Sequence, residues 1–351
     1  MPPGKGSNDR GVTMDEVARA AGVSQATVSR VVNGNPRVNS DAKRQVERAI
    51  ERLGFVPNVA ARTLVTRRSD SIGVVITEPA TRVFGDPFFA QVLRGVSAAL
   101  TARRQKLVLF LPQDPAEERD LEPYLLAGHV DGVIMYSLHG DDPLPAQLHA
   151  RGMPVVVGGL PPVGATVSYV DNDNRGGALL ATGHLLGLGR RRVGTVTGPL
   201  DMPAAIDRLA GYHEALQIAG VRPEPALESE GAFTQESGVD AMRRLLASAP
   251  DLDGVFVASD LMAAGALQVL QEAGRRVPHD VAVIGFDDAP IALTTRPTLS
   301  SVRQSLDAMG RELANLLLAS IEHRDQVVRK VVLATELIVR ESSGGQPTEH
   351  A

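Results

Sequence analysis

The sequence predicts a small all-α domain at the N-terminus, followed by a core of two α/β lobes with doubly wound parallel sheets. Residues 12–35 read as two short helices on either side of Gly22, and a third helical pattern starts at Ser40. From residue 70 onward, apolar runs alternate with helical stretches, and the alternation restarts near residue 190. About 280 residues follow the helical head, which suits two lobes better than one small core.

Capping and spacing signals set the limits of the first two helices. The hydroxyl of Thr13 can cap the first helix while Glu16 reaches back to the amide of Thr13, which is a capping box. Gly22 permits a tight turn, and Ser24 can cap the second helix. Apolar residues at helical spacing form the inner faces, namely Val17, Ala18, Ala21, Val28, Val31 and Val32. This pattern predicts a helix-turn-helix, so DNA is the first partner to consider.

The outer face of the second helix is polar and carries a single positive charge. It presents Gln25, Ala26, Ser29 and Arg30. Such a face suits the major groove, where arginine pairs with guanine and glutamine with adenine. A bare two-helix pattern is equally compatible with an ordinary solvated helical hairpin.

Charge separates the helical head from the rest of the chain. Through Arg68 there are twelve Lys and Arg against six Asp and Glu, whereas the remainder holds 24 against 35. The net charge of −5 therefore hides a basic head, which favours DNA over the solvated hairpin. The third helix carries Val46, Ile50 and Leu53 inward and ends at Gly54, which can adopt the left-handed conformation.

A family resemblance becomes specific beyond the third helix. The segment NVAARTLVTRRS is basic and too short to form a stable helix alone in water. The pattern V-A-x-x-A-G-V-S-x-x-T-V-S-R-V-V-N, followed by G-F-V-P-N-x-x-A-R-x-L, resembles the lactose-repressor (LacI) family of bacterial transcriptional regulators through most of the chain. The resemblance implies a periplasmic-binding-protein-like core and a hinge helix that orders on DNA. It also implies that Leu64 enters the minor groove, although a linker residue packed on the core is the alternative.

The predicted DNA-contacting residues come from the helix-turn-helix and from the resemblance. They are Thr13, Ser24, Gln25, Ala26, Thr27, Ser29, Arg30, Asn33, Asn58, Ala61 and Leu64. Because two heads of a homodimer would read the two halves of a palindrome, double-stranded operator DNA and a second copy of the chain are the expected partners. The polar end SSGGQPTEHA lacks the leucine-heptad tail by which the lactose repressor itself tetramerises.

The core elements follow in a regular order. The first lobe shows the strands SIGVVIT, KLVLFL, DGVIMY and MPVVVG, separated by helices through Leu100, Leu126 and Ala150. The second lobe repeats the pattern with RRRVGTVTG, DGVFVAS and DVAVIGF. A return helix near Asp307 to Ser320 and the last strands in RKVVLATELIVRES suggest several crossings between the lobes, as in a hinged clam. Ligands of such sheets gather at the carboxyl ends of the strands, which here face one another across the cleft.

The predicted boundaries follow from this order. We expect a flexible tail over 1–11, the helix-turn-helix over 12–56, the hinge helix and linker over 57–69, and a disordered tail over 342–351. The core spans 70–341, with the first lobe at about 70–167 and 300–328 and the second lobe at about 168–299 and 329–341.

Residues at strand ends are the candidates for ligand binding in the first lobe and at its junction with the second. Asp86 ends the loop after SIGVVIT, and Phe88 and Phe89 follow at a helix start in a chain with only 3% aromatic residues. Core packing is an equally good reading of Phe89. Asp173 follows a comparable strand and is a weaker candidate. His139 reads as an exposed loop histidine, and a position at the cleft is the alternative.

The second lobe supplies the remaining candidates. Arg208, in a segment similar to the family's G-P…R-L-x-G, stands where the resemblance implies an arginine that clamps the effector; an ion pair with Asp207 or a surface carboxylate is the alternative. Phe233 stands where family members often place an aromatic ring. The resemblance makes Ser259 and Asp260 cleft-edge residues, although helix capping explains Asp260 as well. Asp287, in VIGFDD, is the carboxylate expected to hold ligand hydroxyls.

This set of residues favours a neutral, polyhydroxylated effector. An arginine, carboxylates and aromatic faces suit a carbohydrate, such as a monosaccharide or disaccharide. A purine is less expected because Met202 and Ala204 stand where the purine-responsive branch has polar residues. The alternatives are a corepressor-dependent regulator and a global regulator that responds to a phosphorylated carrier protein or another metabolite.

Several classes of protein are disfavoured by the sequence. It contains no P-loop, GxSxG or HExxH motif and no cysteine, so we expect neither an enzyme nor a cofactor or metal site. A periplasmic receptor would need an export signal, whereas MPPGKGSNDRG is polar, and a nucleoid protein would not need a two-lobed core. The absence of a long apolar run predicts no membrane association, and we expect a cytoplasmic protein.

Overall fold

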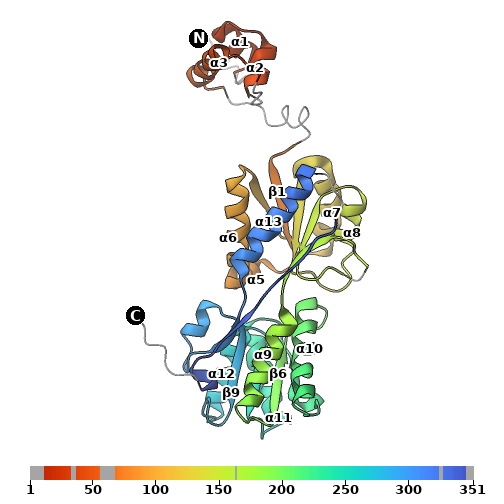
Figure 1. The fold of residues 1–351 in the computed structure, drawn as a ribbon, viewed down its shortest axis with the longest axis vertical. Helices are drawn as coiled ribbons and strands as arrows, with labels where there is room; N and C mark the ends of the chain where they lie inside the picture. Colours follow the sequence, from red (N-terminus) through yellow and green to blue (C-terminus); the bar gives the residue numbers. More distant parts are fainter. Residues whose placement is uncertain (1–11, 33–36, 56–67, 163, 324–326, 345–351) are drawn as a thin grey trace, which may run out of the picture. The chain divides into compact units, whose positions relative to one another are not determined.

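The computed structural model describes residues 12–32, 37–55, 68–162, 164–323 and 327–344, and its chain forms two compact units (Figure 1). The first unit comprises residues 1–69 and the second comprises residues 70–351. No helix in the described ranges is both long enough and apolar enough to cross a membrane.

In its described residues, the first unit contains three helices with well-defined ends. They are α1 (Met14–Ala21), α2 (Gln25–Val32) and α3 (Ser40–Leu53). Thr13 and Glu16 form the predicted capping box, in which the Thr13 amide donates to Glu16 at 2.8 Å. Gly22 and Gly54 end α1 and α3 with φ angles of 65° and 63°, in the left-handed region that favours glycine.

The three helices enclose a core made largely of small side chains. Its buried members are Val17, Ala18, Ala21, Val28, Val46, Ala49 and Phe55. Because alanine faces the neighbouring helix at several of these positions, α1 can approach both α2 and α3 closely. The predicted inner residues Val31, Val32, Ile50 and Leu53 pack against this core while staying partly exposed.

The second unit contains two six-stranded sheets and their covering helices. The strands are β1 (Ser71–Ile76), β2 (Lys106–Phe110), β3 (Gly132–Tyr136), β4 (Val155–Gly158), β5 (Ser168–Asn172), β6 (Val193–Thr197), β7 (Glu228–Glu230), β8 (Gly254–Val257), β9 (Ala282–Asp287), β10 (Ser300–Arg303), β11 (Lys330–Leu333) and β12 (Glu336–Ile338). The helices are α5 (Ala80–Gly85), α6 (Pro87–Ala102), α7 (Pro115–Tyr124), α8 (Leu144–Ala150), α9 (Asn174–Gly187), α10 (Pro203–Ile218), α11 (Gln235–Ser248), α12 (Asp260–Glu272) and α13 (Leu306–His323), with short turns η1 (Leu125–His129), η2 (Pro225–Leu227), η3 (Pro290–Leu293) and η4 (Glu341–Ser343).

Both sheets have the doubly wound order that the sequence predicts. The first sheet runs β11-β5-β4-β3-β1-β2 and the second runs β12-β10-β9-β8-β6-β7. All of their strand pairs are parallel except β10 with β12. In each sheet the order reverses beside the first strand, between β1 and β3 and between β6 and β8, and such reversals open a crevice at the carboxyl ends of the strands.

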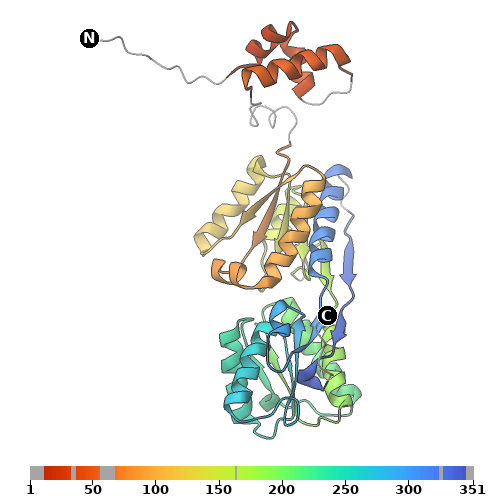
Figure 2. The ribbon, with the colours of Figure 1, turned by 90° about the vertical axis from the view of Figure 1, so that its left-hand side faces the viewer.

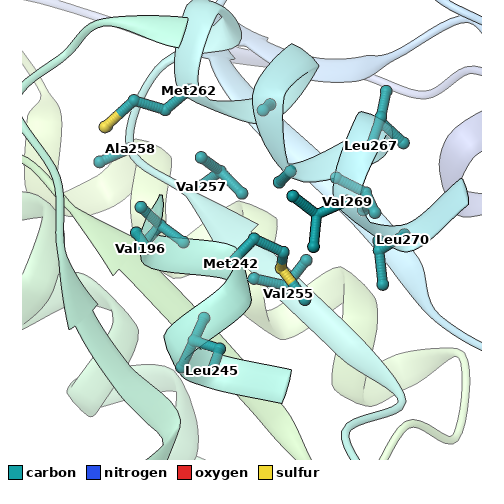
Figure 3. Packing of buried hydrophobic residues seen from close by; sticks show 14 of the residues in the cluster. Val196, Met242, Leu245, Val255, Val257, Ala258, Met262, Leu267, Val269 and Leu270 are labelled. Atoms are coloured by element: carbon teal, nitrogen blue, oxygen red, sulfur yellow. The ribbon is translucent and has the colours of Figure 1, made fainter. Parts of the chain in front are cut away.

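Alternating side chains bury both faces of each sheet. In β1, Ile72, Val74 and Ile76 pack under α6 and α13, whereas Val75 packs with residues of α7 and α8. Figures 1 and 2 show helices on both faces of each sheet. Figure 3 shows the corresponding packing in the second lobe, where Met242 and Leu245 of α11 meet Val196, Val255 and other residues of the sheet. These aliphatic faces hold the strand ends in fixed positions.

The chain passes between the lobes three times, and the predicted lobe boundaries need correction. β5 pairs with β4, so residues 168–172 belong to the first lobe rather than the second. β10 pairs with β9, so residues 300–303 belong to the second lobe rather than the first. The segment 329–341 is divided, because β11 pairs with β5 and β12 pairs with β10. Pairing between strands that are distant in the sequence decides the lobe to which each strand belongs. Local sequence patterns do not predict this pairing.

The start of the predicted C-terminal tail is also different. Ser342 and Ser343 are buried, and Ser342 Oγ donates to the carbonyl of Val283 at 2.7 Å. The Ser342 hydroxyl also accepts from the Ser300 amide at 2.8 Å. The small hydroxyl side chains therefore belong to the second lobe, and a disordered tail from residue 342 is wrong for residues 342–344. The predicted tail over 1–11, the hinge helix over 57–67 and residues 345–351 lie outside the described residues.

Candidate functional site

A cavity lies between the two lobes at the reversals in strand order. The empty space that it outlines is about 690 Å³, which includes open solvent. The lining residues follow the carboxyl ends of strands or lie at helix starts. They are Arg82, Asp86, Phe88, Tyr136, Ser137, Leu138, Gly158, Gly159, Leu160, Asp171, Asn172, Asn174, Met202, Pro203, Ala204, Arg208, Phe233, Ser259, Asp287, Gln304 and Met309.

Arg208 is a buried cation in the wall of this cavity. Its Nε donates to Oδ1 of Asn174 at 2.9 Å, and its Nη1 donates to the carbonyl of Ala258 at 2.5 Å. The guanidinium carbon lies 3.8 Å from the centre of the Phe286 ring, and Nη1 lies 3.8 Å from Oδ1 of Asp287. The alternative prediction was an ion pair of Arg208 with Asp207 or with a surface carboxylate. Among the described residues, the carboxylate within ion-pair distance of Arg208 is instead that of Asp287. Burial lowers the pKa of Arg208, while Asp287 opposes this shift.

Three carboxylates reach the cavity under conditions that favour their neutral forms. Burial raises the pKa of Asp171 to about 6, and it raises the pKa values of Asp86 and Asp287. Asp287 nevertheless accepts a hydrogen bond from Nε2 of Gln304 at 2.6 Å. Asp86 caps α6 by accepting from the Phe88 amide at 2.9 Å. A protonated carboxyl group can both donate and accept hydrogen bonds, which suits the hydroxyl groups of a ligand.

Aromatic rings form the apolar part of the wall. Phe88 and Tyr136 lie in the first lobe with ring centres 5.6 Å apart, and Phe233 comes from the second lobe. Glycine makes room for two of these rings, because a Cβ atom at Gly158 would lie 1.9 Å from the Tyr136 ring and one at Gly198 would lie 2.0 Å from the Phe233 ring. Flat apolar faces of this kind pack against the C–H surfaces of a ring-shaped ligand.

Three residues predicted to contact the ligand do not line the cavity. Phe89 is buried in the core of the first lobe, because it faces α13 and the sheet rather than the cavity. Asp173 caps α9 by accepting from the Gly176 amide at 2.8 Å. Asp260 is fully buried and accepts from Ser301 Oγ at 2.6 Å and from the Ala289 amide at 2.7 Å.

The other predicted ligand-binding residues line the cavity, and several lining residues were not predicted. Asp86, Phe88, Arg208, Phe233, Ser259 and Asp287 all reach it, and Ser259 also caps α12. Lining residues that the sequence did not predict include Arg82, Tyr136, Asp171, Asn172, Asn174 and Gln304. Tyr136 ends the predicted strand DGVIMY, so its position at a strand end could have identified it. Arg82 lies in the short helix α5 and Gln304 lies between β10 and α13, and no strand-end pattern in the sequence marks either of them.

The helix-turn-helix presents the predicted face of α2 to solvent. Gln25, Ala26 and Arg30 are exposed, whereas Thr27 and Ser29 are partly covered. Ser24 accepts from the Thr27 amide at 3.2 Å, and Thr13 caps α1, so both have structural roles beside the predicted DNA contact. Asn33, Asn58, Ala61 and Leu64 lie outside the described residues.

Family comparisons cover both units of the chain. The family model for bacterial regulatory proteins of the lacI family matches residues 13–58, and the model for a periplasmic binding protein-like domain matches residues 182–343. The regulator CelR of Thermobifida fusca is 49% identical over 333 residues, which are 94% of this chain and 98% of the relative. The repressor PurR of Haemophilus influenzae strain PittEE is 33% identical over 337 residues, which are 94% and 98% of the two chains.

Two solved structures extend these similarities to the fold. The complex of the transcriptional regulator CelR with cellobiose has a TM-score of 0.76 at 46% identity, covering 94% of this chain and 99% of the other. The lac repressor dimer bound to operator and the anti-inducer ONPF has a TM-score of 0.84 at 27% identity, covering 95% and 99%. Both similarities include the helical head and the two-lobed core.

Proposed function

The chain belongs to the lacI family of bacterial regulatory proteins and is a DNA-binding regulator of transcription, and from this premise we propose that it is a repressor controlled by a disaccharide of the cellobiose type. The observation that carries this proposal is the cavity of Arg208, buried carboxyl groups and aromatic rings, in a chain 46% identical to a regulator solved with cellobiose. The cavity is where we place the sugar.

The chemistry of the cavity supports a sugar over a charged or planar ligand. Arg208 donates to Asn174 at 2.9 Å and lies 3.8 Å from Asp287, so donors and acceptors stand close together in the wall. Met202 and Ala204 line the wall with apolar groups, which do not complement the polar edge of a purine base. A neutral polyol satisfies the polar groups and covers the rings without adding a buried charge.

On the DNA side, we propose that two copies of the chain bind the two halves of a palindromic operator. The lac repressor, which has the same fold at 27% identity, was solved as a dimer bound to operator. In this proposal α2 enters the major groove, where Gln25 and Arg30 read base edges. Such a regulator acts in the cytoplasm, where bacterial DNA is found.

The two sites are coupled through thermodynamic linkage. If the sugar binds more tightly to the lobe arrangement that disfavours operator binding, it releases DNA, and operator DNA weakens sugar binding by the same factor. This is induction. A corepressor would strengthen both binding events, so the sign of the coupling separates the two regulatory modes.

Calorimetric titration of the full chain tests the proposed ligand. We expect cellobiose to bind wild type, and ribose and adenine to bind far more weakly. Asp287→Asn should lose affinity by about fivefold, since a hydrogen bond to the ligand contributes about 1 kcal/mol. Asp280→Asn, which alters an exposed pair with Arg276 on the second lobe, is the control. Tighter binding of adenine than of cellobiose would overturn the proposal.

A further inference from the structure

A chain of polar residues runs from the wall of the cavity to the edge between the lobes. It begins at Arg82 of α5, whose Nη1 lies 2.5 Å from Oε1 of Glu78. The same oxygen of Glu78 accepts from Ser137 Oγ at 2.6 Å and lies 3.1 Å from Nε2 of His139. Glu78 is buried, and a buried carboxylate is costly unless it is paired. Ser137 and His139 therefore fix the position of the Glu78 carboxylate, and this carboxylate fixes the Arg82 guanidinium.

The same chain of contacts reaches the second lobe. Nδ1 of His139 lies 3.0 Å from Oδ2 of Asp201, and the Gly140 amide donates to the carbonyl of Asp201 at 2.9 Å. The guanidinium of Arg82 also lies 5.1 Å from the centre of the Phe233 ring. Glu78 and His139 follow β1 and β3 of the first sheet, whereas Asp201 and Phe233 follow β6 and β7 of the second. These contacts therefore depend on the distance between the lobes.

One donor of Arg82 is left without a hydrogen-bond partner by the described residues. Its side chain lines the cavity and is 14% exposed. Its Nε is buried and has no hydrogen-bond partner within the part of the chain that the structure describes. An unsatisfied buried donor destabilises the folded state, so the Arg82 guanidinium retains the capacity for one more hydrogen bond.

We propose that Arg82 is the specificity-determining effector contact of the first lobe, and that Glu78 and His139 couple this contact to closure of the lobes on Asp201. The inference rests on the proposed function, because it assumes that the cavity holds the effector. Arg208 then binds the effector from the second lobe and Arg82 binds it from the first. His139 is a positioning residue, since it acts through Glu78.

His139 and its contacts with Glu78 and Asp201 form a bridge between the lobes. This bridge should make closure of the lobes sensitive to pH. An imidazole between two carboxylates pairs best when both ring nitrogens carry protons. The hydrogen bond to Glu78 raises the pKa of His139 against the effect of burial, and Asp201 adds to the rise. The other charged groups lining the groove beside His139 are Glu118, Arg119 and Glu122 of α7, together with Asp142. Closure therefore takes up a proton, and effector affinity should fall as the pH rises through the raised pKa.

Titration of full-length variants with cellobiose at pH 6.0 and pH 8.5 tests both parts of the inference. Arg82→Met should weaken binding about 10- to 100-fold at both pH values, because a charged donor is lost. His139→Gln keeps a polar side chain that does not titrate, and it should lose part of the pH dependence of wild type. His149→Gln, on α8 of the same lobe, is the matched control and should retain the wild-type difference. Asp171 and Asp287 also titrate in the cavity, so the comparison of His139→Gln with wild type isolates the bridge.

The outcomes separate this inference from the proposed function. Wild-type affinity in Arg82→Met would overturn the role of Arg82, and an unaltered pH dependence in His139→Gln would overturn the coupling. If wild type does not bind cellobiose, the proposed function and the role of Arg82 fail together. The bridge is then judged without ligand by an NMR titration of His139. A pKa that falls in Asp201→Asn supports the bridge, and an unchanged pKa overturns it.

Discussion

Three residues that line the cavity have positive φ angles although none is glycine. The angles are 60° at Ser137, 58° at Phe233 and 109° at Asp287. Each such conformation costs on the order of 1–3 kcal/mol and persists only where its surroundings hold it. Here Ser137 bonds to Glu78 and Asp287 bonds to Gln304. The rest of the fold thus stabilises strained residues where side chains must point into the cavity.

Substitution of Gly198 should perturb the aromatic wall. In Gly198→Ala the new Cβ would lie 2.0 Å from the Phe233 ring, so the ring must move. Because an aromatic contact contributes about 1 kcal/mol, we expect cellobiose affinity to fall about fivefold. Gly183→Ala is the control, since its Cβ meets nothing within 4 Å on α9. Calorimetry on both variants checks the prediction, and unaltered affinity in Gly198→Ala would show that the ring position is irrelevant.

Asp171 should make stability depend on pH. Burial raises its pKa to about 6, whereas an unfolded aspartate titrates near pH 3.9. Between these values the folded state binds more protons than the unfolded state, so the free energy of unfolding falls as the pH rises. Asp171→Asn should therefore gain about 3 kcal/mol over wild type above pH 7 and little near pH 4.

Urea denaturation of both proteins at pH 4 and pH 7.5 measures this difference. A gain of equal size at both pH values would mean that the charge of Asp171 is not the cause. Asp280→Asn provides a comparison at an exposed carboxylate whose pKa is lowered by Arg276. It should lose stability above pH 4, which is the opposite direction.

At the scale of single residues, the sequence predicted which residue types form the cavity better than it predicted where each side chain points. Arg208 and Phe233 could be found from the family resemblance, and Asp287 from the resemblance and from its place at a strand end. Phe88 and Phe89 were predicted together, but successive residues of a helix point about 100° apart. Only Phe88 reaches the cavity. The sequence pattern does not say which of the two faces the second lobe.

At the scale of elements, α6 and α13 pack with unusually close backbones. A Cβ at Gly95 would lie 2.1 Å from the carbonyl of Asp307, and one at Gly310 would lie 2.1 Å from the carbonyl of Val92. These two helices cover one face of the first sheet, as Figure 1 shows. The loop before α6 carries Asp86, and the loop before α13 carries Gln304. Close packing of the pair therefore sets the separation of two lining residues.

Enlarging Gly310 should force these helices apart. We expect Gly310→Ala to destabilise the core by about 1–3 kcal/mol, because backbone atoms must shift to admit the methyl group. The measurement is the free energy of unfolding in urea, with Gly187→Ala at an open position as the control. A loss no larger than that of the control would show that the helices separate without cost.

Elements were predictable where their signals are local. The capping box at Thr13 and the apolar run of β1 depend on neighbouring residues, and both appear as predicted. The sheet membership of β5 and β10 depends on pairing with β4 and β9. No local sequence pattern indicates that pairing. The segments that begin at residues 168 and 300 were therefore predicted to lie in the wrong lobes.

At the scale of the whole molecule, function depends on three connections that join the lobes. They run from β5 to α9, from β10 to α13 and from β11 to β12. Segments this short allow the lobes to change their angle while their cores remain intact. An effector that contacts both lobes can therefore favour one angle, and the free-energy difference between angles limits the response.

The central proposal is that a sugar in the cavity releases the protein from DNA. Operator DNA is first selected from a randomised duplex library with the full chain, and its complex is then followed by fluorescence anisotropy as cellobiose is added. We predict a loss of operator affinity of about 5- to 150-fold, the usual range of allosteric coupling. Asp287→Asn should bind the same DNA and resist release. Operator affinity that is unchanged or increased by saturating cellobiose would contradict the proposal.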